Sequence, residues 1–472
     1  MERRLNALLL VTVAMLLASM TVLGCDSSET TNTGGSAGTT ATGSGGVAGT
    51  GGSAMGGTGG TSGQGGTAGS GGDIGGNGGS GGSPTGGAGG TGGQGGSPSG
   101  GSGGTIATGG SGGFGGQGGS AGAGGAGGGG ECPTWQSGPG LTCSNWQQLD
   151  DPDLAAMNLV WGGQALSETD VFVVGGTYGA GKIVRYDGND WVDQTLPNTS
   201  SLSNVMVLSP TEAYAVGKGP MWSFDCIMLE LTSGSTWSTV TGTPAIGSLW
   251  GCSGLWAENS SDMFLLATDA LTSKIYRGPK NGPWSEMTLP SFPNSMQLEE
   301  VWGSSVDDVY AVGYMTIGGD PVGGVLLHYD GNTNDEWISI PMNPVVIMLN
   351  AVSGSGPCDV VVGGRAFDNS VYKGITMHYD GSGWTAPELT EDVQNVTGIV
   401  QRAPNETLAA GSTDLPLNEG GFGSDDGSLG LFWGKPFGQY GYFRGLSAVP
   451  GSNRVFIFAE ANGTHVLSAS CN

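Results

Sequence analysis

The feature that most constrains this chain is a phrase that returns from residue 145 to the end. It contains an apolar run with Trp-Gly, a turn rich in Ser and Asp, a β-like run that closes on Gly, and a Tyr-Asp-Gly segment before a Trp. Its clearest copies are VWGSSVDDVYAVG (301–313) with LLHYDGNTNDEW (326–337), and VWGGQALSETDVFVVGG (160–176). Such repetition means that one supersecondary unit is stacked many times. Most of the conspicuous residues are therefore expected to be scaffold.

The period of the repeat predicts the kind of unit. Successive spacings between the ends of the β-like runs are 42, 50, 46, 50, 48 and 48 residues, measured at Gly175, Gly217, Ala267, Gly313, Gly363, Gly411 and Ala459. A unit of this length holds four short strands, which is the size of a β-propeller blade. We therefore predict an all-β fold, a β-propeller of seven four-stranded blades in residues 131–472. Six or eight blades are the alternatives, because the second, third and sixth copies are degenerate.

The two ends of the repeat are complementary. The last copy, residues 443–470, has only three expected strands, whereas residues 145–149 resemble the fourth strand of a blade. Trp146 precedes Trp191 by 45 residues, in register with the period. We therefore expect the N-terminal strand to close the last blade, which would cover edges that otherwise invite aggregation.

A double Gly followed by Tyr and Trp resembles the kelch propeller repeat. The first and fifth copies fit best, with Gly175-Gly176, Tyr186 and Trp191 in one and Gly363-Gly364, Tyr379 and Trp384 in the other. Together with the N-terminal segments described next, the repeat also resembles secreted lipoproteins of the myxobacterial type. Neither resemblance implies an established activity.

The first 24 residues are typical of a lipoprotein signal peptide. Arg3 and Arg4 precede an apolar stretch, Leu8 to Leu23, that is too short to span a membrane comfortably. The following Gly24-Cys25 resembles a bacterial lipobox, which implies lipidation at Cys25; an ordinary signal peptide with a chance Cys is the alternative. We expect an exported protein, lipid-anchored to the bacterial cell envelope at the outer membrane surface or in the periplasm.

Residues 25–130 are expected to form a tether between the lipidated Cys and the propeller. Between Gly34 and Gly130, 52 of the 97 residues are Gly, and Asp73 carries the only charge. A segment with so few apolar side chains cannot offset the entropy lost on ordering. We therefore predict that this Gly/Ser/Thr-rich linker is disordered.

Cysteine usage supports export. Apart from Cys25, the chain has six Cys residues: Cys132, Cys143, Cys226, Cys252, Cys358 and Cys471. An even number in an exported chain favours disulfides, for which 15 pairings exist. The propeller topology brings Cys226 near Cys252 and Cys143 near Cys471, so these are the candidate pairs. Whether Cys132 and Cys358 pair is left open.

Residues that recur at equivalent positions are interpreted as scaffold. Turn side chains of the repeat are expected to bond turn backbone, and they are Asp170, Asp262, Asp308 and Asp359, with Glu212 in the second copy. His328 and His378 both precede Tyr-Asp-Gly, so they are expected to be strand residues. His465 is the only other His, which leaves little material for a His-based triad or a metal centre.

Residues that break the repeat are the better candidates for function. The loops between the second and third strands of each blade differ, and they should all emerge on one face of the ring. Aromatic and acidic side chains there would suit a glycan or a protein ligand, although solvated, variable loops are an equal alternative. The candidates are Tyr178, Trp222, Phe224, Asp225, Phe367, Asp368, Tyr372 and Phe422, and the fourth loop also offers Tyr314.

The charge balance limits the partners. Residues 131–472 carry 36 acidic and 12 basic side chains, so nucleic acid is excluded as a natural partner. Asp414, Glu419, Asp425 and Asp426 offer oxygen ligands for Ca²⁺, but their spacing matches no known calcium loop. We therefore expect no cofactor and no metal site, with Ca²⁺ as the alternative.

These patterns favour a membrane-anchored, non-enzymatic propeller for recognition or adhesion. The alternative is a glycan-cleaving hydrolase that uses loop carboxylates such as Asp225 and Asp425. Sialidase propellers carry a Ser-x-Asp-x-Gly-x-Thr-Trp turn, and its nearest trace here, residues 232–237, lacks the Asp. A purely structural role in the envelope is the third hypothesis.

Overall fold

The structure is a computed structural model, and it describes the repeat region with short gaps. All described residues belong to one compact unit of the chain. They are residues 132, 141–177, 179–196, 199, 201–219, 225–244, 249–269, 272–331, 334–404, 406–413, 420–425, 431–434, 442–460 and 464–472.

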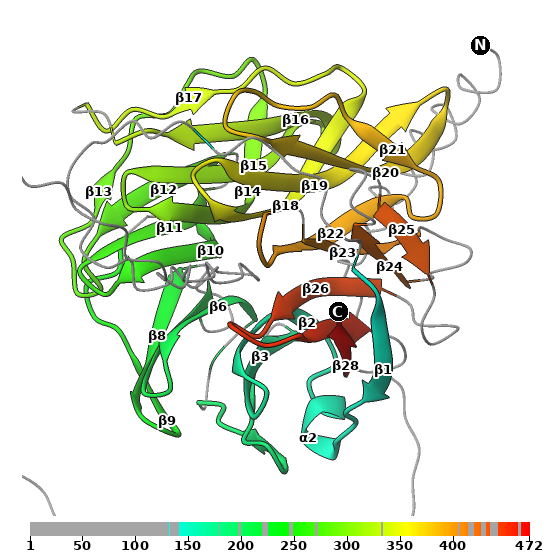
Figure 1. Cartoon of the computed structure of the whole chain (residues 1–472). Coiled ribbons are helices and arrows are strands. Elements are labelled where there is room, and N and C mark those ends of the chain that lie inside the picture. The colour runs from blue at the N-terminus through cyan, green and yellow to red at the C-terminus, as the bar shows by residue number, and fades with distance from the viewer. Residues whose placement is uncertain are drawn as a thin grey trace, which may run out of the picture. The chain divides into compact units, whose positions relative to one another are not determined.

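The described strands form seven antiparallel four-stranded sheets (Figure 1). Six sheets consist of four consecutive strands, and the seventh combines β1 with the last three strands. The first strands of the sheets are β2 (Val160–Ser167), β6 (Leu202–Ser209), β10 (Leu249–Asn259), β14 (Ser295–Ser305), β18 (Val346–Gly356), β22 (Asn395–Gln401) and β26 (Tyr442–Ala448).

The other strands follow in the same order. The second strands are β3 (Asp170–Thr177), β7 (Glu212–Lys218), β11 (Asp262–Asp269), β15 (Asp308–Ile317), β19 (Asp359–Asp368), β23 (Thr407–Ser412) and β27 (Arg454–Glu460). The third strands are β4 (Ala180–Tyr186), β8 (Cys226–Ser233), β12 (Ser273–Gly278), β16 (Asp320–Tyr329), β20 (Val371–Tyr379), β24 (Gly420–Asp425) and β28 (Thr464–Cys471). The fourth strands are β5 (Trp191–Asp193), β9 (Thr236–Thr239), β13 (Ser285–Glu286), β17 (Ile338–Ser339), β21 (Glu388–Thr390), β25 (Leu431–Gly434) and β1 (Cys143–Gln148).

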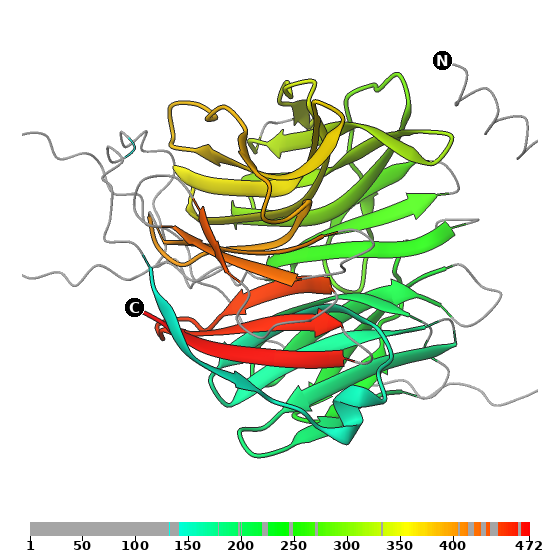
Figure 2. The same cartoon turned by 90° about the vertical axis from the view of Figure 1, so that its right-hand side faces the viewer.

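The sheets are arranged as a ring. Each first strand contacts the first strands of its two neighbours, and β26 contacts β2, which completes the circle (Figures 1 and 2). The predicted all-β propeller is therefore confirmed. β1 pairs with β28 at the outer edge of the last sheet, so the N-terminal strand completes this sheet. The one helix among the described residues, α2 (Pro152–Ala155), has a single turn, and no described helix is long and apolar enough to cross a membrane.

Side chains bond to backbone across every junction between neighbouring first strands. For example, the Ser253 hydroxyl of β10 donates to the Leu298 carbonyl of β14 at 2.9 Å. The seven contacts, in order around the ring, are Gln164–Val207, Ser203–Cys252, Ser253–Leu298, Glu300–Val352, Asn350–Val396, Thr397–Phe443 and Ser447–Ala165. Because these side chains satisfy backbone groups near the ring axis, the junctions need no continuous sheet between blades.

Aromatic rings of the neighbouring sheet pack directly against glycines in the first strands. A Cβ atom added at Gly303 would lie 2.8 Å from the ring of Trp256, which is fully buried in the sheet of β10–β13. Gly354 stands in the same relation to Trp302, and Gly163 to Phe458. The recurring Gly therefore serves close packing between sheets, which any side chain would obstruct.

The recurrent Asp residues pair with the third strand of their own sheet. Asp170 receives two hydrogen bonds from the Arg185 guanidinium, both at 2.7 Å, and Asp262 pairs with Arg277 in the same way. His328 and His378 replace Arg in two further sheets, where they bond Asp308 and Asp359 at 2.7 Å. The Asp side chains thus bond Arg or His side chains of the third strand instead of the expected turn backbone, while turn residues such as Ser305 cap the turn at 3.3 Å. Both His residues lie in third strands, as expected.

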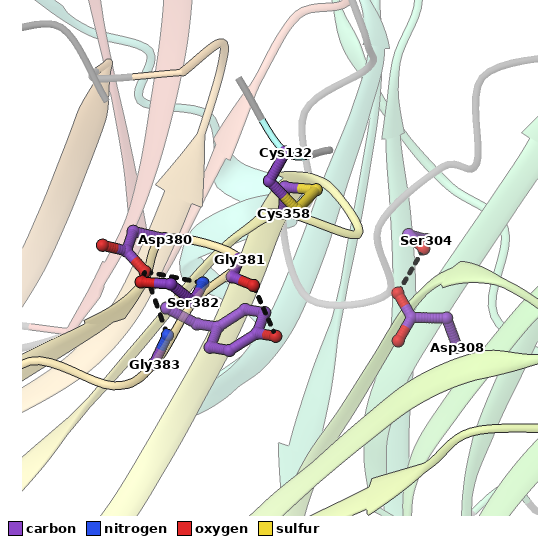
Figure 3. The surroundings of a disulfide bond; sticks show 9 residues. Cys132, Ser304, Asp308, Cys358, Asp380, Gly381, Ser382 and Gly383 are labelled. Carbon is purple, nitrogen blue, oxygen red and sulfur yellow. Dashed lines mark hydrogen bonds between the residues drawn. A yellow bond between two sulfur atoms is a disulfide. The ribbon is translucent and has the colours of Figure 1, made fainter. Parts of the chain in front are cut away.

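Three disulfides link the described residues, and their positions define two faces of the ring. We call the side where first strands begin and where second and third strands join the mouth face, and the opposite side the base face. Cys226–Cys252 lies on the mouth face. Cys143–Cys471 joins β1 to β28, and Cys132 is bonded to Cys358 in the β18–β19 turn (Figure 3), both on the base face. The first two are the candidate pairs of the sequence analysis.

We predict that Gly303→Ala destabilises the protein because the new methyl group meets the Trp256 ring. Overpacking of this kind costs about 1–3 kcal/mol, so the midpoint of urea unfolding should fall. The matched control is Gly356→Ala at the end of β18, where an added Cβ has no neighbour within 4 Å. Equal midpoints for the two variants would contradict the packing role of Gly303.

Candidate ligand-binding site at the mouth of the ring

Each first strand has a β-bulge near its start, at the mouth face. The register with the second strand skips one residue in every sheet, and these bulge residues are Trp161, Ser203, Ser253, Glu299, Asn350, Thr397 and Arg444. All seven side chains are partly or fully accessible. A bulge redirects a side chain out of the pleat, and such features are common next to functional sites. The bulges thus place one side chain from each sheet in a common ring.

Four of the seven bulge residues make the same contact. Ser203, Ser253, Asn350 and Thr397 each donate a hydrogen bond to the carbonyl group just before the next sheet's bulge residue. These side chains are among the junction contacts described above. The common residue at this position is therefore a neutral hydrogen-bond donor that links two neighbouring sheets.

The other three bulge residues bond to the second strand of their own sheet. Trp161 donates through Nε1 to the Gly176 carbonyl at 3.1 Å. The Arg444 guanidinium bonds Glu460 at 2.8 Å and lies 5.1 Å from the centre of the Trp161 ring. Glu299 shares a hydrogen bond with the Tyr314 hydroxyl. An aromatic ring, a cation and a carboxyl group are thus presented where the other sheets present a small neutral donor.

A cavity of about 690 Å³ opens among these residues. Trp161 and Glu299 line it together with Tyr314 and Lys218. Most of its other polar lining is neutral, and consists of Ser201, Ser203, Ser253, Thr268, Ser295, Thr316 and Gln297, with Asp269 as the second carboxyl group. The cavity therefore combines hydroxyl and amide groups with an aromatic surface that is 37% exposed at Trp161.

Burial raises the pKa of Glu299, and the hydrogen bond from Tyr314 only partly offsets this effect. Burial likewise raises the pKa of Tyr314, which the Glu299 carboxyl raises further. Among the described residues, no Lys, Arg or His side chain forms an ion pair with Glu299. A carboxyl group in a low-dielectric environment without a counter-charge favours its neutral form.

The next residue, Glu300, belongs to the junction and not to the cavity. It is 4% exposed, and its carboxyl group accepts a hydrogen bond from the Val352 amide of the neighbouring sheet at 2.8 Å. Burial raises its pKa to about 8, although the Val352 amide acts in the opposite direction. Two adjacent Glu residues thus have different roles, because the bulge turns Glu299 toward the cavity while Glu300 bonds the neighbouring strand.

The described residues contain part of the predicted mouth-loop set. Phe367 and Tyr372 lie on the β19–β20 hairpin with ring centres 5.1 Å apart, and Asp368 pairs with Lys373 at 3.2 Å. Asp225 precedes β8 and is exposed. None of these four lines the cavity as the described residues define it. Tyr178, Trp222 and Phe224 lie outside the described residues, as does the side chain of Phe422.

The sequence analysis missed Trp161, Glu299 and Arg444. The two Trp-Gly pairs used to align the repeat are not equivalent. The strand registers show that Trp161 holds the position of Glu299 in its own sheet, and that Gln164 holds the position of Trp302. Counting back nine residues from the recurrent acidic residue gives the bulge residue in five sheets. That spacing is the signal that would have found Trp161 and Glu299.

The described residues contain no group of three or more Cys, His, Asp or Glu residues suited to a metal ion. The predicted alternative of Ca²⁺ at Asp414, Glu419, Asp425 and Asp426 concerns side chains outside the described residues.

Solved structures of several other proteins are similar to this chain. No family model and no curated protein matches the chain, so its resemblance to kelch repeats stays a prediction. The structure is similar to YCF48 bound to D1 peptide, with a TM-score of 0.48 and 17% identity over 70% of this chain and 96% of that chain. It is also similar to the β-propeller domain of Myceliophteria thermophila Cps50 (Swd1), with a TM-score of 0.45 and 12% identity over 70% of this chain and 99% of that one. A PL25 ulvan lyase, bound to a glucuronic acid–sulfated rhamnose unit, matches with a TM-score of 0.42 and 10% identity over 65% and 90%.

We predict that Glu300→Gln makes stability less dependent on pH. A carboxyl group whose folded pKa is raised to about 8 stabilises the fold fully below its ordinary pKa of 4.5, and this contribution is lost as the pH rises through 8. The Gln amide keeps an acceptor for the Val352 amide but cannot ionise. The variant should therefore have a higher thermal unfolding midpoint than the wild type at pH 9, by roughly several degrees, and a similar one at pH 5.

Ser253→Ala is the control for this experiment, because it removes another junction contact without removing a titratable group. It should lower the midpoint by a similar amount at both pH values. If Glu300→Gln behaves in the same way, the buried carboxyl group is not the source of the pH dependence.

Proposed function

We propose that this protein is an exported, lipid-anchored propeller, of seven blades, that recognises glycans at its mouth without cleaving them. The cavity at the bulge ring carries the proposal. Sugars present hydroxyl groups at their edges and weakly polar C–H groups on their faces, so their binding sites combine hydrogen-bonding side chains with an exposed aromatic ring. Trp161 supplies the ring, and the Ser, Thr and Gln side chains of the lining supply the hydrogen bonds.

Two further observations support this assignment. Neutral side chains with a hydroxyl or amide group are numerous in the lining, and they can bond the hydroxyl groups of a ligand while the apolar part of the lining contacts its C–H groups. The β15–β16 and β19–β20 hairpins at the mouth face also expose apolar side chains, with Ile317 at 58%, Phe367 at 45% and Tyr372 at 42%. These residues lie outside the cavity and offer secondary contacts to a longer chain.

We predict that Trp161→Ala weakens glycan binding by about tenfold or more, as expected for truncation of a central aromatic residue. The measurement is binding of the purified full-length protein to a glycan array, followed by calorimetric titration of the ligands that bind. Ile338→Ala on the outer strand β17 is the control, because it removes an exposed apolar side chain outside the cavity. Absence of binding to every glycan, or binding that is indifferent to Trp161, would refute the mouth as a glycan site.

The anchoring part of the proposal rests on Cys25, which lies outside the described residues. The three disulfides accord with an exported protein, since such bonds persist in oxidising compartments. We predict that Cys25→Ser abolishes incorporation of labelled palmitate in a bacterial host and moves the protein from the membrane fraction to the soluble fraction. Retention of the label in this variant would exclude lipidation at Cys25.

A hydrolase is the second candidate function, and one observation favours it. The raised pKa of Glu299 is the property of a general acid, and Asp269 is the second carboxyl group in the described lining. However, Asp269 accepts a hydrogen bond from the Thr272 amide at 3.0 Å and so caps the end of its own strand. Chromatography of a bound oligosaccharide after incubation separates the two functions, since shortened products that disappear in Glu299→Gln would establish hydrolysis.

A further inference from the structure

Glu299 differs from every other bulge residue because it has an acidic side chain. The equivalent positions hold Ser, Asn or Thr in four sheets, Trp in one and Arg in one. The junctions therefore do not need a carboxyl group here, and the contact between β14 and β18 is made by Glu300 instead. Glu299 thus does not make the junction contact that four of its counterparts make.

No basic side chain among the described residues forms an ion pair with Glu299, although Lys218 lines the same cavity. The Tyr314 hydroxyl is the hydrogen-bonding partner of Glu299. Burial raises its pKa, which measures how poorly the site solvates the ionised form. A cation that enters the cavity would supply the missing counter-charge, and a charge-assisted hydrogen bond is among the stronger polar contacts.

The rest of the cavity and of the protein favours a cationic sugar. Trp161 and Tyr314 offer aromatic faces, which attract both sugar C–H groups and ammonium groups. The hydroxyl-bearing lining matches the hydroxyl groups of a sugar. The net charge of −26 attracts cations over a long range. Lys218 also lines the cavity, and a ligand with both hydroxyl and ammonium groups can place the ammonium away from it.

Resting on the proposed glycan-binding function, we infer that the mouth cavity is selective for amino sugars, with Glu299 as the residue that recognises the primary ammonium group. The Glu299 carboxylate and the Tyr314 hydroxyl accept hydrogen bonds from the ammonium group, and Trp161 packs against the sugar ring. An N-acetylated sugar of the same length lacks the charge and loses this contact.

The test compares two probes that differ only in this group, a chitosan tetrasaccharide and its fully N-acetylated counterpart. Calorimetric titration of the full-length wild-type protein should show about tenfold tighter binding of the chitosan probe, the order expected for one charge-assisted hydrogen bond. Glu299→Gln should remove this difference and leave the affinity for the acetylated probe within about twofold. Glu300→Gln is the matched control, because it makes the same change at the adjacent, buried residue and should preserve the selectivity.

Each other outcome has a distinct meaning. Equal binding of both probes by the wild type, or equal loss in the two Glu variants, would overturn the role of Glu299 while leaving glycan recognition intact. Failure of both probes, together with an empty glycan array, would overturn the proposed function itself. Binding of trilysine with the same dependence on Glu299, without binding of chitosan, would show that the ammonium ligand is a peptide and overturn the sugar assignment.

Discussion

The contact between neighbouring first strands is the constraint on which the rest of the structure depends. A propeller sheet is too small to be stable alone, so it must bury its faces against two neighbours, and the sequence of such contacts must return to its start. Here the recurring Gly lets an aromatic ring of the neighbouring sheet approach the backbone, as Trp256 does at Gly303. Hydrogen bonds from Ser, Thr, Asn, Gln and Glu side chains hold the strands near the axis.

The fold could be predicted from the sequence because its signals are periodic. The recurring β-like runs, their spacing and the incomplete last copy were sufficient to predict the propeller class and the pairing of β1 with β28. Two disulfide pairs followed from the same topology. His328 is a strand residue, as predicted, but Asp308 bonds His328 across the sheet and not the turn backbone. A local sequence motif shows that a residue is repeated, but the side chain that it bonds is set by the register of the neighbouring strand, which the motif does not give.

The candidate site could not be predicted in the same way because it depends on a register that motifs obscure. The Trp-Gly pairs at Trp161 and Trp302 look alike, but their side chains have opposite roles. Trp302 packs against Gly354 of the next sheet, while Trp161 is exposed in the cavity. Sequence reasoning favoured irregular loops, which is where propellers vary most. In the described structure, the unusual side chains instead lie on strands, at the β-bulge that every sheet has. Three of these bulges carry Trp161, Glu299 and Arg444 in place of a small neutral donor.

The disulfide between Cys132 and Cys358 has a mechanical consequence. Any pull on the chain before Cys132 reaches the propeller first at the β18–β19 turn, on the base face, because the covalent bond lies upstream of β1. The force is therefore not applied to β1, whose hydrogen bonds to β28 would otherwise break one after another from the N-terminal end. The disulfide between Cys143 and Cys471 also fixes the N-terminal end of β1, where the separation of β1 from β28 would begin. β1 is thereby protected from tension. The force enters the ring at the base face, on the side opposite the mouth face and its cavity.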